Sequence, residues 1–274
     1  RDLTANGVAS NFYVLFRNYW ESWAWAGGQA DKIEDRATRG GPAMLWRGNR
    51  YVGGGGGSDA RRKFSVQAET ERWTNEFGSD GNYFWAQLTY RPTPAIRVSL
   101  SPTYRQSTEK VQYVTTIDDP SYTATFGKRY VFATLAQKTL DIGIRTEWTV
   151  SSRLSAQLYL QPFVASGDYS DYKTLTRPRD DEFTPVDVVY DAAANAYSGA
   201  LAFDNPDFNF RSVRGSAVVR WEFRPGSAMY VVWSENRADV APVGDFRFRR
   251  DFSALPNAPS QDVFLIKFSY WLPV

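Results

Sequence analysis

The sequence contains no cysteine and no histidine, and only two of its 274 residues are methionine. Without cysteine the chain forms no disulfide and no thiolate site, and it is compatible with any redox compartment. Without histidine it has neither a Ser-His-Asp nor a Cys-His arrangement, nor an imidazole metal site. Only carboxylate chemistry is left for catalysis, and we expect no enzymatic activity and no cofactor.

The sequence also lacks any run of 18 apolar residues, which excludes a membrane-spanning helix. Strands of a membrane β-barrel stay compatible, because they need only about 9–11 residues with every second one apolar. The net charge of +2 implies no polyanion partner, and the run Gly53–Gly57 lacks the Lys-Ser/Thr ending of a phosphate-binding loop. We therefore expect no nucleic-acid partner.

The chain does not begin with Met, and "RDLTANGVAS" has neither the apolar stretch nor the cleavage site of a signal peptide. We expect it to be a processed product or the C-terminal part of a longer barrel protein.

Aromatic residues are abundant, at 16% of the chain, and they favour strands and apolar–water boundaries. Strict alternation of apolar and polar residues recurs along the chain, most clearly over 137–150, whereas helical periodicity is absent. About ten strands are predicted, near 10–25, 44–58, 62–76, 82–92, 95–110, 128–150, 153–167, 208–224, 227–238 and 262–273.

The predicted connections alternate in length. Short turns fall at "SDARRK", "RPTP", "TVSSR" and "RPGS", and the longer connections are 26–43, 77–81, 111–127, 168–207 and 239–261. Short turns on one side and long loops on the other are typical of outer-membrane barrels. We predict one domain over 1–274, a transmembrane antiparallel up-and-down β-barrel with both termini on the short-turn side and 168–207 as a long surface loop. A soluble β-sandwich or barrel is the alternative.

The alternation also assigns side chains to faces, because an Arg or Lys at the bilayer midplane on the lipid side of a barrel costs about 2–4 kcal/mol. The charged residues predicted to face the lumen are Glu69, Glu71, Arg97, Arg105, Asp141, Arg145, Glu147, Arg214, Arg220, Glu222 and Lys267. The residues predicted to face lipid are Leu140, Ile142, Ile144, Trp148, Leu158, Leu160, Val219, Trp221, Phe264, Ile266, Phe268 and Tyr270. The inward charges either pair and fill the interior, which we favour for ten strands, or line a solute path.

Three further features carry predictions. The run Gly53–Gly57 is interpreted as a natural strand against which another backbone or a bulky aromatic residue crowds, with a flexible laboratory linker as the alternative. Strand 128–150 is too long for an apolar band of about 25 Å, so we predict that 95–110/128–150 and 153–167/208–224 continue beyond the lipid as a wall. Segment 168–207 is expected to fold over or beside that wall, and Lys138 to lie away from the middle of the band.

The longest loop holds the best acidic cluster, made of Asp168, Asp171, Asp180, Asp181, Glu182, Asp187 and Asp191. We interpret it as a solvated loop with local ion pairs, because Arg177 and Arg179 lie between the acids. A calcium site and a carboxylate pair acting on a sugar are the alternatives. The spacing matches no calcium-binding loop, so no metal site is predicted.

Several long strings resemble one bacterial family: "VQYVTTIDDP", "TFGKRYVFATL", "LYLQPFVASGDYSDYKTLTRPR", "FNFRSVRGSAVVRWEFRPGS" and "DVFLIKFSYWLP". They resemble the C-terminal outer-membrane barrel region of the family "domain of unknown function 5916". The resemblance covers about residues 36–274, and it implies a barrel that often follows a carbohydrate-binding-family-9-like module. It implies no activity.

We expect an integral outer-membrane β-barrel of a Gram-negative-type bacterium that forms the membrane-embedded part of a larger surface or transport assembly. Its expected partners are outer-membrane lipid, the barrel assembly machinery during insertion, and partner proteins or an upstream carbohydrate-binding module. A solute channel, with carbohydrate as one candidate solute, is the first alternative. A surface enzyme using the loop carboxylates is the second. Substrate, oligomeric state, organism and closure of the ten strands are left open.

Overall fold

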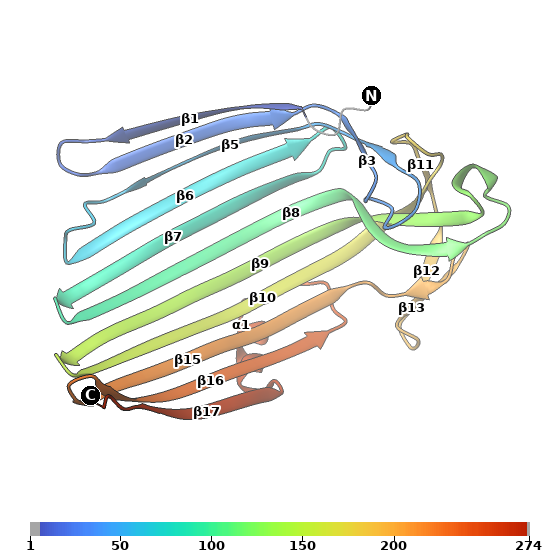
Figure 1. Cartoon of the computed structure of the whole chain (residues 1–274). Helices are drawn as coiled ribbons and strands as arrows, with labels where there is room; N and C mark the ends of the chain where they lie inside the picture. Colours follow the sequence, from blue (N-terminus) through green and yellow to red (C-terminus); the bar gives the residue numbers. More distant parts are fainter. Residues whose placement is uncertain (1–5, 273–274) are drawn as a thin grey trace.

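The computed structural model describes residues 6–272, and its main feature is one large antiparallel β-sheet (Figure 1). Its strands follow one another in chain order, and every neighbouring pair is antiparallel. The strands in this order are β1 (Gly7–Leu15), β2 (Glu21–Gln29), β5 (Asn49–Gly57), β6 (Phe64–Asn75), β7 (Asp80–Thr93), β8 (Ile96–Asp118), β9 (Lys128–Ser151), β10 (Leu154–Leu175), β15 (Phe208–Arg224), β16 (Ser227–Ala241) and β17 (Ser260–Ser269).

Shorter elements lie in the long connections. The strands β3 (Lys32–Glu34) and β4 (Met44–Trp46) pair with each other, and β11 (Phe183–Pro185) pairs with β10. The strands β12 (Val188–Asp191), β13 (Ala196–Gly199) and β14 (Phe203–Asp204) form a small sheet. The helical elements are η1 (Thr123–Thr125), α1 (Phe248–Ala254) and η2 (Leu255–Asn257). These elements correct two predictions, since 168–207 was expected to be a loop and no helix was expected; all are too short to show a periodicity.

The alternation of connection lengths is confirmed except between β6 and β7, where the connection 76–79 is shorter than the turn 58–63. Short turns join β1 to β2, β5 to β6, β7 to β8, β9 to β10 and β15 to β16 at one end of the sheet, and the other connections lie at the opposite end. At the turn between β15 and β16, Gly226 has φ 76°, which glycine adopts after the rigid Pro225 without strain. The connection 77–81 is brief, because β7 begins at Asp80.

The prediction of about ten strands is wrong at the N-terminal end, where the path holds one strand more. Segment 10–25 is not one strand but parts of β1 and β2, joined by a turn in which the amide of Phe16 donates to the carbonyl of Trp20. The amide of Trp20 also donates to the side chain of Asn18. The extra strand reverses the direction of the N-terminal end, so β1 starts on the long-connection side rather than on the short-turn side.

The sheet is open within residues 6–272. The strand β1 pairs only with β2, and β17 pairs only with β16. The sequence predicts barrel strands and leaves their closure open, and no closed barrel is seen in this part of the chain. No helix in the described part of the chain is long and apolar enough to cross a membrane.

The long-connection end of β8, β9 and β10 extends past the neighbouring strands; residues 109–118, 128–136 and 168–175 are called the sheet extension below. Its two faces are both covered. One core contains Met44, Tyr130, Phe132 and Leu175, and the other contains Val131, Ala133, Tyr172 and Leu201. Alternate positions of β9 thus enter opposite cores. The prediction that 128–136 is strand is confirmed, and segment 168–207 packs against it.

At the short-turn end, Asp59 and Arg61 connect the β5–β6 turn to the neighbouring β1–β2 turn. The Asp59 carboxylate accepts bonds from the Arg61 backbone amide (3.0 Å) and guanidinium (2.9 Å), and that guanidinium lies 3.2 Å from the centre of the Tyr19 ring in the neighbouring turn. The hydrogen bonds from the Arg61 side chain and backbone lower the pKa of Asp59 to about 2.

This pKa predicts a pH-dependent effect of Asp59→Asn. A carboxylate with a depressed folded-state pKa stabilises the fold fully above its unfolded value of about 4 and loses this contribution as the pH falls through the folded value. We expect the wild type to be more stable than Asp59→Asn at about pH 5, and the difference to vanish below about pH 2. Urea titrations across this range measure the difference; a difference that is constant with pH contradicts the prediction.

Candidate functional site on the polar face

The register of the sheet places the two predicted sets of side chains on opposite faces. The charged positions alternate with apolar ones on each strand, and cross-strand partners share a face, as Arg97 does with Glu147 and Arg220 with Tyr230 and then Lys267. The face that carries Glu69, Arg97, Arg105, Asp141, Arg145, Glu147, Arg220, Glu222 and Lys267 is called the polar face, and Glu71 and Arg214 share it. The other face is called the apolar face. That the polar face lines a lumen and the apolar face contacts lipid stays a prediction.

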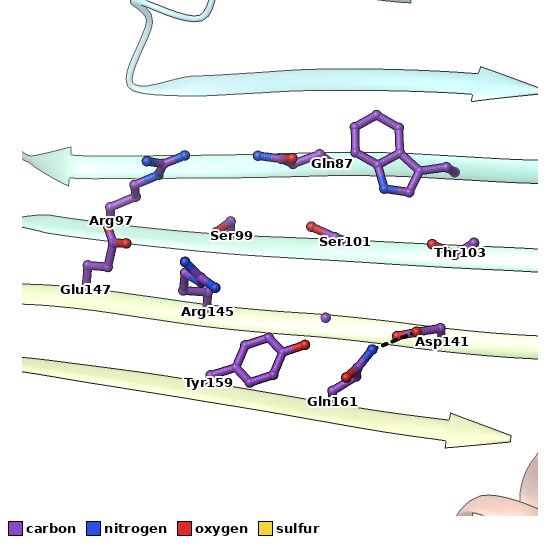
Figure 2. Close-up of a pocket in the computed structure, with 12 residues that line it drawn as sticks. Gln87, Arg97, Ser99, Ser101, Thr103, Asp141, Arg145, Glu147, Tyr159 and Gln161 are labelled. Carbon is purple, nitrogen blue, oxygen red and sulfur yellow. Dashed lines mark hydrogen bonds between the residues drawn. The ribbon is translucent and has the colours of Figure 1, made fainter. Parts of the chain in front are cut away.

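A concave site of about 400 Å³ lies in the middle of the polar face, across β7 to β10 (Figure 2). It is called the polar site. Its charged residues are Arg97, Asp141, Arg145 and Glu147, so their formal charges cancel. Aromatic, amide and hydroxyl groups complete the lining: Trp85, Tyr159, Gln87, Gln161, Ser99, Ser101 and Thr103.

The side chains of the polar site are only partly paired. The amide of Gln161 donates to the Asp141 carboxylate at 2.7 Å, and the Arg145 guanidinium lies 5.6 Å from the centre of the Tyr159 ring. The Nε of Arg97 is buried without a hydrogen-bond partner among the described residues. Gly143, which has no side chain, also lines the site, between Asp141 and Arg145 in the sequence of β9. The arrangement offers donors, acceptors and both signs of charge to a polar solute.

A second feature of the polar face is a set of side chains that cross the glycine-rich strand β5. The indole NH of Trp23, on β2, donates to Glu69 on β6 at 3.1 Å, and that of Trp25 donates to Glu71 at 2.5 Å. On β5, Gly55 lies between Trp23 and Glu69 in the register of the sheet. Gly53 lies in the same way between Trp25 and Glu71. Any side chain there would collide with the indoles, since a Cβ on Gly53 would lie 2.3 Å from Cζ2 of Trp25. The prediction that a bulky aromatic residue crowds the glycine run is confirmed.

This packing predicts that Gly55→Ala is destabilising. A Cβ at this position would lie 2.4 Å from the carbonyl oxygen of Ala68 and 2.7 Å from Cβ of Glu69, and a backbone oxygen has little freedom to move away. We expect a loss of about 1–3 kcal/mol in the free energy of unfolding. The matched control is Gly143→Ala, where the nearest atom is 3.6 Å from the new Cβ and no loss is expected. Equal effects of both substitutions in urea titrations would contradict the steric account.

Sequence reasoning missed Trp23 and Trp25 as members of the polar face, because it treated 10–25 as one strand. The available signal was the spacing itself: two tryptophans two residues apart match glycines two residues apart on the partner strand. The aromatic lining of the polar site at Trp85 was also missed.

The acidic residues of segment 168–207 do not form one site. Asp180 pairs with Arg177, Glu182 lies 3.6 Å from the same arginine, and Asp181 lies 3.2 Å from Arg47. No group of three acidic side chains suited to a metal ion occurs within residues 6–272. These ion pairs agree with the part of the interpretation that assigned the acids to local ion pairs.

The apolar face carries the second predicted set: Leu140, Ile142, Ile144, Trp148, Leu158, Leu160, Val219, Trp221, Phe264, Ile266 and Phe268, with Tyr270 just after β17. Many are exposed, such as Trp148 at 48% and Phe264 at 75%. Towards the long connections this face ends in a row of cross-strand partners without apolar side chains: Arg72, Asn82, Gln106, Lys138 and Ser166. Lys138 thus lies at the end of the apolar region and not at its middle.

A family model described as "Domain of unknown function (DUF5916)" matches residues 6–274. No curated protein and no solved structure matches the chain. The description of the family names no activity, so a functional argument has to start from the two faces of the sheet.

Proposed function

The chain belongs to the family described as "Domain of unknown function (DUF5916)", and we propose that its sheet is part of the wall of a β-barrel embedded in a bacterial outer membrane. The apolar face contacts lipid, and the polar face lines the interior. The chain serves as the membrane-embedded part of a larger surface or transport assembly.

The observation that carries this proposal is the exposed apolar face, which is uncharged over β6 to β10. Below the row that contains Lys138, cross-strand partners continue it across β6 to β10 without a charged side chain. In β15 to β17 the part of this face nearest the long connections carries charged residues, namely Arg211, Glu235, Arg237, Asp239 and Asp262. In β6, β7 and β8 its members are Phe64, Val66, Ala68, Thr70, Phe84, Ala86, Leu88, Tyr90, Ile96, Val98, Leu100, Pro102 and Tyr104. Proteins in water rarely expose an apolar surface that extends over a whole sheet, whereas the lipid-facing side of a membrane barrel has this character.

The sheet extension supports the same assignment. There the apolar residues on both faces of β9 are buried, with Phe132 at 1% and Val131 at 0% exposure. Elements of the long connections supply the cover on each side. A sheet that leaves the bilayer needs such cover against water, and one inside the bilayer does not. The exposed apolar face and the covered sheet extension are separated by the row Arg72, Asn82, Gln106 and Lys138.

Outer-membrane insertion is tested by flotation with lipid vesicles and by gel mobility with and without heating. A membrane barrel floats with the vesicles and migrates differently after heating. A protein that stays soluble without detergent and shows neither property rules the proposal out.

A second candidate function is passage of a polar solute along the polar face. The open polar site and the unpartnered Arg97 Nε favour it, because a fully paired interior would leave neither. Conductance across a planar bilayer distinguishes the two functions. Steady current that changes on Arg97→Gln or Arg145→Gln supports a channel, whereas absence of current supports the structural role.

A further inference from the structure

The two free edges of the sheet run in the same direction. Each of the pairings from β1 to β17 reverses direction, and the path holds an odd number of strands, so its first and last strands are parallel to each other. Figure 1 shows this directly, since both β1 and β17 run from the long-connection end to the short-turn end.

This direction restricts how the sheet can close. Direct pairing of β1 with β17 would be parallel, in a sheet where every other pair is antiparallel. If a second copy of the chain had the same orientation in the membrane, the β1 of each copy would again pair in parallel with the β17 of the other. A copy that pairs in the antiparallel sense is inverted, which would place the long connections of the two copies on opposite sides of the bilayer. Single-chain bacterial barrels accordingly have even numbers of strands.

Both edges have the features of strands that pair. All of β17 is exposed, and β17 contains no proline and pairs with β16 without a bulge. The strand β1 is similarly exposed and regular. Natural edge strands that stay free are usually short or are protected by charges, prolines or bulges. In a bilayer each unpaired backbone group costs several kcal/mol, so free edges of this length are not tolerated.

We propose that an odd number of further strands, from the same polypeptide but outside residues 1–274, joins β17 to β1 and closes the barrel. This inference rests on the proposed membrane location. The source follows from the sheet order, in which the neighbours are consecutive in sequence, so the strand beside β1 is the one that precedes it in the polypeptide.

The edges also define the chemistry of these strands. The strand beside β17 is apolar where it continues the face of Phe264, Ile266 and Phe268. On its other side it meets Val263, Leu265 and Lys267, which favours apolar residues and one acidic residue there.

Photo-crosslinking in the native outer membrane tests the proposal. The photoreactive amino acid p-benzoylphenylalanine replaces Phe264 or Phe268 on β17, and Val8 or Phe12 on β1, one position at a time, and the joined peptides are identified by mass spectrometry. The matched control is Val231 on β16, whose partners Val219 and Ile266 are known, so its products must come from β15 or β17.

We expect the four edge positions to join peptides of the same polypeptide outside residues 1–274. The products of Phe264 and Phe268 should appear in reverse order along the partner strand, as antiparallel pairing requires. Products between β17 and β1, with a second copy, or with a separate protein would each overturn the proposal, as would the absence of edge products when Val231 reacts. Flotation of the unsubstituted protein is measured in parallel; if it fails, the membrane location itself is wrong, whatever the crosslinks show.

Discussion

Leu158→Arg is expected to reduce the free energy of unfolding in lipid vesicles by about 2–4 kcal/mol, the cost of a cationic side chain near the bilayer midplane. Leu158 lies on the apolar face of β10 between Thr146 and Ala217 and is 40% exposed. It lies four residues after Leu154, the first residue of β10, which at about 2.5 Å of rise per residue places it roughly 10 Å into an apolar band of about 25 Å.

The neighbouring residue provides the matched control. Gln157 lies on the polar face, beside Glu147, and Gln157→Arg should change stability by less than about 0.5 kcal/mol. Urea titrations of vesicle-inserted protein measure both variants. In a water-soluble sheet, an exposed leucine also tolerates arginine, so equal small effects at both positions would contradict the lipid assignment of the apolar face.

Phe132→Ala is expected to destabilise the sheet extension by about 3–5 kcal/mol, because a fully buried aromatic side chain is removed. Phe132 is 1% exposed, and its ring packs edge-on against Phe183 at a centroid distance of 5.3 Å and against Tyr113 at 5.9 Å. The extension has its own two cores, so we expect segments 32–46 and 183–204 to become sensitive to protease while the membrane-embedded strands stay protected.

Limited proteolysis of vesicle-inserted protein, followed by mass spectrometry, measures this local loss. Phe126→Ala is the control, because Phe126 is 72% exposed in the connection between β8 and β9 and should be neutral. If Phe132→Ala instead left these segments resistant, or exposed β10 and β15 equally, the extension would not be a separately packed unit.

Alternation was sufficient to predict the long strands and their faces. In β9, Leu140, Ile142 and Ile144 alternate with Asp141 and Arg145, and a strand with period two has no other way to separate these side chains. The short turns were equally accessible, since their composition is local; "RPGS" contains the Pro-Gly pair that its turn requires.

Features that depend on contacts between residues distant in sequence could not be predicted from the sequence alone. The turn Phe16–Trp20 has a bulky composition and is held by a bond from the Trp20 amide to Asn18, so the sequence concealed a strand boundary there. The strand β8 continues to Asp118 through bulges, which interrupt the alternation on which the prediction relied. The bonds from Trp23 and Trp25 to β6 depend on a three-strand register that no single segment contains.

In the polar site, too, the faces of the strands could be predicted from the sequence, whereas the side-chain contacts between strands could not. The alternation assigned Arg97, Asp141, Arg145 and Glu147 to one face correctly, because each lies within a regular strand. It could not show that Gln161 bonds to Asp141, since the two belong to different strands and their approach depends on side-chain conformation.

The most direct test of the membrane location is the environment of successive residues along β10. Residues 1–274 contain no cysteine, so single cysteines introduced at 156–161 can each carry a nitroxide spin label. The collisions of each label with oxygen and with a water-soluble nickel chelate are compared. If the account is correct, oxygen accessibility is high at Ala156, Leu158 and Leu160 and low at the alternate positions Gln157, Tyr159 and Gln161. Equal or greater access of the nickel chelate at the even-numbered positions would show that the apolar face meets water, and would contradict the account.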